Sequence, residues 1–147
     1  MATIALDTNI LVYGLLEPES SKKQTAEMLI SAVADKGVLA AQVLAELLAV
    51  TRRLNPRLLP AVTDRMTDLI STYRVEPTTE DVLLRASSLV QRYELQVFDS
   101  IICAASDFAG AAILLSEDMQ DGMRVGGLRI LNPFNPDNRA EIEALLA

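Results

Sequence analysis

Short runs of apolar residues alternate along the chain with longer segments in which apolar positions recur every three or four residues. Short runs of this kind are typical of strands that are buried on both faces, and the longer segments are typical of amphipathic helices. The predicted strands are 3–6, 38–41, 74–77, 111–115 and 128–131. Four predicted helices have both bounds in the pattern, namely 21–35, 43–54, 61–73 and 98–108. Three more are predicted with less definite bounds: one directly after 7–9, one that starts within 78–81 and runs to about 93, and a short one from 139.

This alternation predicts an α/β fold in which helices cover both faces of a mostly parallel sheet. No internal repeat, linker or low-complexity segment interrupts the pattern, so we expect a single domain over 1–147, with 132–147 as its C-terminal tail. The helical periodicity places Ile70 and Leu83 on buried helix faces. Cys103 lies in an apolar run and is predicted to be a small core residue.

The composition limits the possible chemistry mainly through what it lacks. The chain has no histidine and one cysteine, which excludes Ser-His-Asp and Cys-His catalysis, histidine-bound zinc and an internal disulfide. A single cysteine fits a reducing cytosol. The first apolar run contains Asp7 and Asn9 and is too short for a targeting or membrane-spanning segment. We therefore expect a cytoplasmic protein whose chemistry relies on carboxylates, with or without a hard cation.

The formal net charge of −7 does not attract nucleic acid over the surface as a whole. If nucleic acid is the ligand, a local basic patch or a bound cation must supply the attraction. The densest basic stretch contains Arg52, Arg53, Arg57 and Arg65. The sequence leaves two interpretations of this stretch open, namely a solvated helix face and a surface that contacts RNA.

Four carboxylates occupy positions where a parallel α/β sheet gathers ligands, outside the carboxyl ends of its strands. Asp7 ends the first strand, and Asp118 closely follows the strand 111–115. Asp99 starts the helix that leads into that strand, and Glu46 lies on the helix after the second strand.

Each residue also has a plainer explanation. Asp7 and Asp99 suit helix N-caps, a lone Glu46 is more often exposed, and Asp118 suits a turn. Their joint placement favours a single site, because independent caps need not converge at one sheet edge. Carboxylates that converge repel one another and take up protons or a cation. Oxygen ligands without histidine or cysteine select Mg²⁺ or Mn²⁺, and such ions promote the hydrolysis of phosphate esters.

Four segments resemble the motifs of the PIN-domain family, in family order. They are 4–13 with Asp7-Thr8-Asn9, 42–46 ending at Glu46, 98–106 with Asp99, and 114–122 with Ser116 and Asp118. Within the family, the chain resembles the VapC-like members, which are the toxins of bacterial toxin–antitoxin pairs. Ser116 stands where threonine is common and Ser100 where alanine is common, and neither departure removes a carboxylate.

The resemblance implies a three-layer PIN-like domain that acts as a Mg²⁺- or Mn²⁺-dependent endonuclease on single-stranded or structured RNA. It implies that the four motif carboxylates hold one or two ions. Thr8, Asn9 and Ser116 are then candidates for orienting the carboxylates or contacting phosphate, and Asp121 is a weaker candidate ligand. It also implies a homodimer and a cognate antitoxin, which could block the site with an arginine.

Two other functions remain as alternatives. A phosphatase of the haloacid-dehalogenase type also begins with a strand that ends in Asp, but it needs a second Asp where this chain has Asn9. It also needs a lysine near the last acidic motif, and the chain has no lysine after Lys36. In a non-catalytic binding module, the carboxylates would be structural and the acidic surface would hold a basic protein segment.

Overall fold

The computed structural model describes residues 2–147, in which six strands and seven α-helices are present. The strands are β1 (Thr3–Leu6), β2 (Gly37–Ala40), β3 (Arg74–Glu76), β4 (Ala111–Leu115), β5 (Arg124–Val125) and β6 (Leu128–Leu131). The α-helices are α1 (Thr8–Leu15), α2 (Ser21–Ala32), α3 (Ala41–Leu54), α4 (Leu59–Thr72), α5 (Glu80–Tyr93), α6 (Val97–Phe108) and α7 (Arg139–Leu146). Three short 3₁₀ helices are η1 (Ala34–Lys36), η2 (Pro56–Leu58) and η3 (Pro136–Asn138).

The strands form one sheet in the order β3-β2-β1-β4-β6-β5. All neighbouring strands run parallel except β5, which pairs antiparallel with β6. β1 lies between β2 and β4, so its carboxyl end opens at the middle of the sheet. Parallel neighbours need long crossover connections, and the helices provide them.

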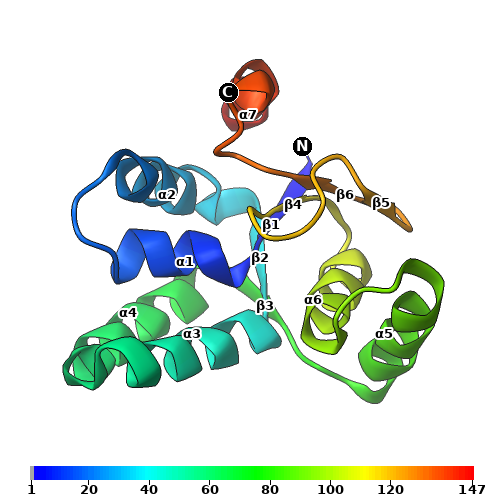
Figure 1. The fold of residues 1–147 in the computed structure, drawn as a ribbon, viewed down its shortest axis with the longest axis horizontal. Helices are drawn as coiled ribbons and strands as arrows, with labels where there is room; N and C mark the ends of the chain where they lie inside the picture. Colours follow the sequence, from blue (N-terminus) through cyan, green and yellow to red (C-terminus); the bar gives the residue numbers. More distant parts are fainter. Residues whose placement is uncertain (1) are drawn as a thin grey trace.

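Helices cover both faces of this sheet (Figure 1). α1, α2, α3 and α4 lie on one side, α5 and α6 pack together on the other, and α7 lies at the end near the N-terminus. The predicted α/β class, with a mostly parallel sheet between helical layers, is therefore confirmed.

The core is aliphatic and centres on β1, β4 and α6. The run Ile101–Ser106 of α6 is buried throughout, because small alanine, serine and cysteine side chains let this helix approach the sheet closely. Cys103 is fully buried, as predicted. Two helix-face predictions were wrong, because the side chains of Ile70 and Leu83 are 50% and 48% exposed. Both lie at the margin of a buried stripe that is narrower than the sequence periodicity suggested.

Several elements differ from those that the sequence predicted. α2 ends at Ala32, and the remaining residues before Gly37 form η1. α3 begins at Ala41, two residues earlier than expected. The short strand β5 was not predicted, and it forms a hairpin with β6 across a turn in which Gly126 has a φ of +61°. The predicted C-terminal helix is present as α7.

Within residues 2–147, the helices are too short or too polar to cross a lipid bilayer.

Candidate active site

A buried aspartate stands at the carboxyl end of β1. The Asp7 amide donates to the Leu115 carbonyl at 2.9 Å, which extends the β1–β4 ladder by one residue. Its carboxylate accepts the Thr8 amide at 2.7 Å and the Ser116 hydroxyl at 2.7 Å. Asp7 therefore caps α1, as its sequence position suggested, and the cap lies at the sheet edge where a ligand site is expected.

Glu46 reaches the same edge from α3. Its two carboxylate oxygens accept the Thr8 hydroxyl at 2.8 Å and the Gln42 side-chain amide at 3.1 Å. The residue is half-buried, so the plainer explanation of a lone, exposed glutamate does not hold. Thr8 donates hydrogen bonds to both acids, because its backbone amide donates to Asp7 and its hydroxyl donates to Glu46.

Asp99 and Asp118 approach from the other side of β1. Asp99 lies in the first turn of α6, whose N-cap residue is Gln96, so the interpretation of Asp99 as an N-cap was wrong. Asp118 is exposed in the loop after β4. Among the described residues, no hydrogen bond involves the side chain of Asp99 or that of Asp118.

The pKa values of Asp7 and Asp99 are raised first by burial and further by the charges of neighbouring acids. Burial raises the pKa of Asp7 to about 6, the bonds from Ser116 and Thr8 oppose that rise, and the charges of Asp99 and Glu46 add to it. Burial also raises the pKa of Asp99, and the charges of Glu46 and Asp118 raise it further. Asp99 is therefore coupled to each of the other three acids, as expected for carboxylates that share one site.

The four carboxylates do not form a closed ligand cage. Within residues 2–147, no three acidic or cysteine side chains are gathered tightly enough to hold a metal ion as they stand. The donor set nevertheless fits a hard divalent cation, because it consists of oxygens from mutually repelling acids. Two buried polar atoms in or beside these motifs, the Asn9 Nδ2 and the Ser100 hydroxyl, also have no protein partner in the described part of the chain.

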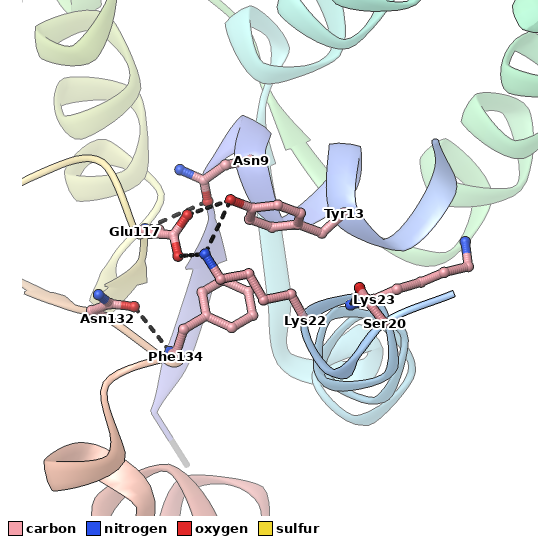
Figure 2. A network of polar contacts seen from close by, with 8 residues as sticks. All are labelled: Asn9, Tyr13, Ser20, Lys22, Lys23, Glu117, Asn132 and Phe134. Carbon is pink, nitrogen blue, oxygen red and sulfur yellow. Dashed lines mark hydrogen bonds and ion pairs between the residues drawn. The ribbon is translucent and has the colours of Figure 1, made fainter. Parts of the chain in front are cut away.

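Of the other predicted residues, Thr8 and Ser116 contact the carboxylates directly. Asn9 accepts a long bond of 3.5 Å from the Glu117 amide, and its side-chain nitrogen points away from Glu117 (Figure 2). The carboxylate of Asp121 is occupied by the C-terminal tail, because it accepts N–H groups from Asn132, Asn135 and Asn138. Burial would raise the pKa of Asp121, but these donors outweigh it and the pKa is lowered.

Several residues around the site were not singled out from the sequence. Gln42 holds Glu46 from one helical turn away, which an i, i+4 rule could have indicated. Glu117, inside the fourth motif, bonds Tyr13 and Lys22 (Figure 2). Lys22 lies 95 positions from Glu117, and no local signal in the sequence links the two.

A cavity of about 680 Å³ lies between α1, α2 and α4. Gly14, Ile30, Arg65 and Tyr73 are among its lining residues, and none of the four carboxylates reaches it. The carboxylate edge is therefore separate from this cavity.

The fold and this edge define an α/β domain that presents acidic side chains where parallel strands end. The PIN-domain family model matches residues 4–120, a span that contains all four carboxylates. The chain belongs to the PIN domain family.

Solved structures with this fold include toxins of toxin–antitoxin systems. A toxin–antitoxin complex from Klebsiella pneumoniae has 20% identity and a TM-score of 0.67, over 90% of this chain and 98% of that chain. VapC20 from Mycobacterium tuberculosis, a sarcin–ricin loop cleaving toxin, has 21% identity and a TM-score of 0.67, over 79% and 90%. DNA-bound VapBC from Salmonella typhimurium has 14% identity and a TM-score of 0.68, over 90% and 99%. At such identities the similarity shows the fold alone. No curated protein matches the sequence.

Proposed function

We propose that this protein is a metal-dependent endoribonuclease that hydrolyses RNA phosphodiester bonds. The observation that carries the proposal is the electrostatic coupling of Asp99 to Asp7, Glu46 and Asp118 at one sheet edge. A chain without histidine has no neutral imidazole for acid–base work, so a carboxylate site is the chemistry that remains.

In this proposal Asp7, Glu46, Asp99 and Asp118 hold Mg²⁺ or Mn²⁺. Such an ion, when bound, supplies positive charge to the phosphate and lowers the pKa of a water molecule. Thr8 and Ser116 orient the carboxylates of Glu46 and Asp7 through the bonds described above. Within the described residues the Asn9 Nδ2 is a buried donor without a protein partner, and we assign Asn9 to orienting the neighbouring carboxylates or contacting phosphate.

The proposal extends to the biological setting. The whole chain, 1–147, acts as one domain with 132–147 as its tail, and it works on RNA in the cytoplasm. Because the structural neighbours include toxin–antitoxin complexes, we propose that the protein is the toxin of a type II pair. A cognate antitoxin would then cover the carboxylate edge, and the toxin would form a homodimer.

The experiment is RNA cleavage by the purified full chain with Mn²⁺, Mg²⁺ or EDTA. Asp99→Asn is the informative variant, because Asp99 couples to the other acids and, in the described structure, accepts no hydrogen bond that the change would break. Asp64→Asn on α4, an exposed acid outside the four motifs, controls for the loss of one negative charge.

We expect metal-dependent cleavage by the wild type and by Asp64→Asn, and cleavage at least a hundredfold slower by Asp99→Asn, on the order of the loss of an essential electrostatic group. Equal cleavage by Asp99→Asn and wild type would contradict the assignment of the site. No cleavage of total RNA under any condition would favour the binding-module alternative.

A further inference from the structure

The loop that carries Asp118 is held at both ends by residues from distant parts of the chain. This loop, residues 116–121, follows β4 and contains Glu117, Asp118 and Asp121. Asp118 is exposed and, within the described structure, its side chain makes no hydrogen bond of its own. Its position is therefore set by what fixes its neighbours.

The first anchor is Glu117, one residue before Asp118. One carboxylate oxygen of Glu117 accepts the Tyr13 hydroxyl of α1, and the other accepts the Lys22 ammonium of α2 at 2.5 Å (Figure 2). Both oxygens are thus occupied by donors, one of them a cation. Glu117 is for this reason an anchor and not a further free acid of the site.

Aromatic rings from α1 and the C-terminal tail hold the Lys22 ammonium in place. The Lys22 Nζ lies 5.1 Å from the centre of the Tyr13 ring and 5.5 Å from that of the Phe134 ring. The two rings meet edge to face with their centres 5.3 Å apart (Figure 2). Cation–π attraction favours this arrangement, so the tail contributes to the first anchor through Phe134.

The second anchor is Asp121, three residues after Asp118. It accepts the Asn132 amide at 2.9 Å, the Asn135 side-chain amide at 2.9 Å, and the Asn138 side-chain amide at 2.9 and 3.1 Å. Asn138 stands at the N-cap position of α7, yet its side chain makes no cap bond. A helix cap would use its side-chain oxygen, whereas the side-chain nitrogen donates to Asp121 and to the Asn132 carbonyl. All three donors to Asp121 belong to the tail.

We propose that the tail segment 132–138, together with Tyr13 and Lys22, positions Asp118 for the nuclease reaction. The proposal rests on the proposed function, because it assigns these residues to the same site. The tail segment lies beyond residues 4–120, the span that the family model matches. Tyr13, Lys22, Asn135 and Asn138 would act through the loop and would not touch the substrate, and positioning groups of this kind typically change metal affinity about tenfold or more.

The experiment uses the full chain and compares the double variant Asn135→Ala/Asn138→Ala with Asp137→Ala. Asp137 lies between the two asparagines in η3, and its carboxylate takes part in none of the anchor bonds. Tyr13→Phe tests the first anchor, since it removes the hydroxyl and keeps the ring that packs on Lys22 and Phe134. The readouts are amide hydrogen exchange of residues 116–121, Mn²⁺ affinity by titration without RNA, and kcat and KM for RNA cleavage.

We expect faster exchange in 116–121 and Mn²⁺ binding weakened about tenfold in both anchor variants. We also expect a lower kcat with an unchanged KM, and wild-type behaviour in Asp137→Ala. Unchanged exchange and Mn²⁺ affinity in the anchor variants would overturn the inference. Faster exchange with unchanged Mn²⁺ affinity and kcat would also overturn it, because the anchors would then be structural only. If the wild type cleaves no RNA, the proposed function fails, and exchange together with Mn²⁺ affinity still decides whether the anchors position Asp118.

Discussion

Replacing Asp7 with asparagine should make the metal-free protein more stable relative to the wild type as the pH rises from 5 to 8. Asp7 is 4% exposed, and burial raises its pKa from 3.8 to about 6, with the charges of Asp99 and Glu46 adding to the effect. The folded protein thus binds this proton more tightly than the unfolded chain does. Ionised Asp7 therefore opposes folding, and the penalty begins as the pH rises above 3.8 and is complete above about 6.

The magnitude follows from the difference between the two pKa values. The interval from 3.8 to about 6 corresponds to about 3 kcal/mol of unfolding free energy when Asp7 is fully ionised. At pH 5 about half of this penalty is present, because the unfolded carboxyl is mostly ionised and the folded one is mostly protonated. The stability of Asp7→Asn relative to wild type should therefore be about 1.5 kcal/mol greater at pH 8 than at pH 5.

The assay is urea unfolding in EDTA, followed by circular dichroism at several pH values from 5 to 8. This range stays above the sequence pI of about 4.5, where the protein is least soluble. Lost hydrogen bonds of Asp7 affect the variant equally at both pH values and cancel in the comparison. Asp64→Asn, which removes an exposed carboxylate, should show no such pH dependence. The reasoning is refuted if the relative stability of Asp7→Asn is the same at pH 5 and pH 8, or falls as the pH rises.

Three further changes test separate parts of the structure. The added methyl group of Gly37→Ala would overlap the Tyr73 ring and lie 2.7 Å from the Val33 carbonyl oxygen. Urea unfolding should therefore show a free energy of unfolding lower by about 1–3 kcal/mol, and an unchanged unfolding midpoint would contradict this packing. Tyr73→Phe removes the hydroxyl that donates to the buried Ile30 carbonyl and should cost about 1 kcal/mol in the same assay, whereas a neutral result would mean that water replaces the bond. Arg53 lies seven residues after Glu46 on α3, two turns along the same face. If Arg53 contacts RNA, Arg53→Gln should reduce the slope of log binding constant against log salt concentration, measured in EDTA, by about one phosphate contact. If this helix face is only solvated, the slope of the variant should equal that of the wild type.

Much of the fold could be predicted because the pattern that specifies it is local. The strands β1, β4 and β6 are short apolar runs buried on both faces, and residues of this type in such runs form the interior of a parallel sheet. The candidate site acids could be picked out of the sequence for a related reason. Asp7 interrupts an apolar stretch where the strand ends, and a charge at that position is unfavourable unless it is bonded or functional.

The parts that could not be predicted depend on contacts across the chain. Asp121 looked like a weak metal ligand, but its partners come from the tail, 11 to 17 residues later. The bond from Lys22 to Glu117 spans 95 residues. The exposure of Ile70 and Leu83 shows that periodicity gives the direction of a buried helix face but not its width.

The most direct test of the central claim is a Mn²⁺ titration of the wild type, Asp99→Asn and Asp64→Asn. The account predicts a Mn²⁺ site in the wild type and in Asp64→Asn that is lost or weakened at least tenfold in Asp99→Asn, because Asp99 is coupled to the other three carboxylates. Equal Mn²⁺ binding by the wild type and Asp99→Asn, or no binding by any of the three proteins, would contradict a shared cation site at the carboxyl edge of the sheet.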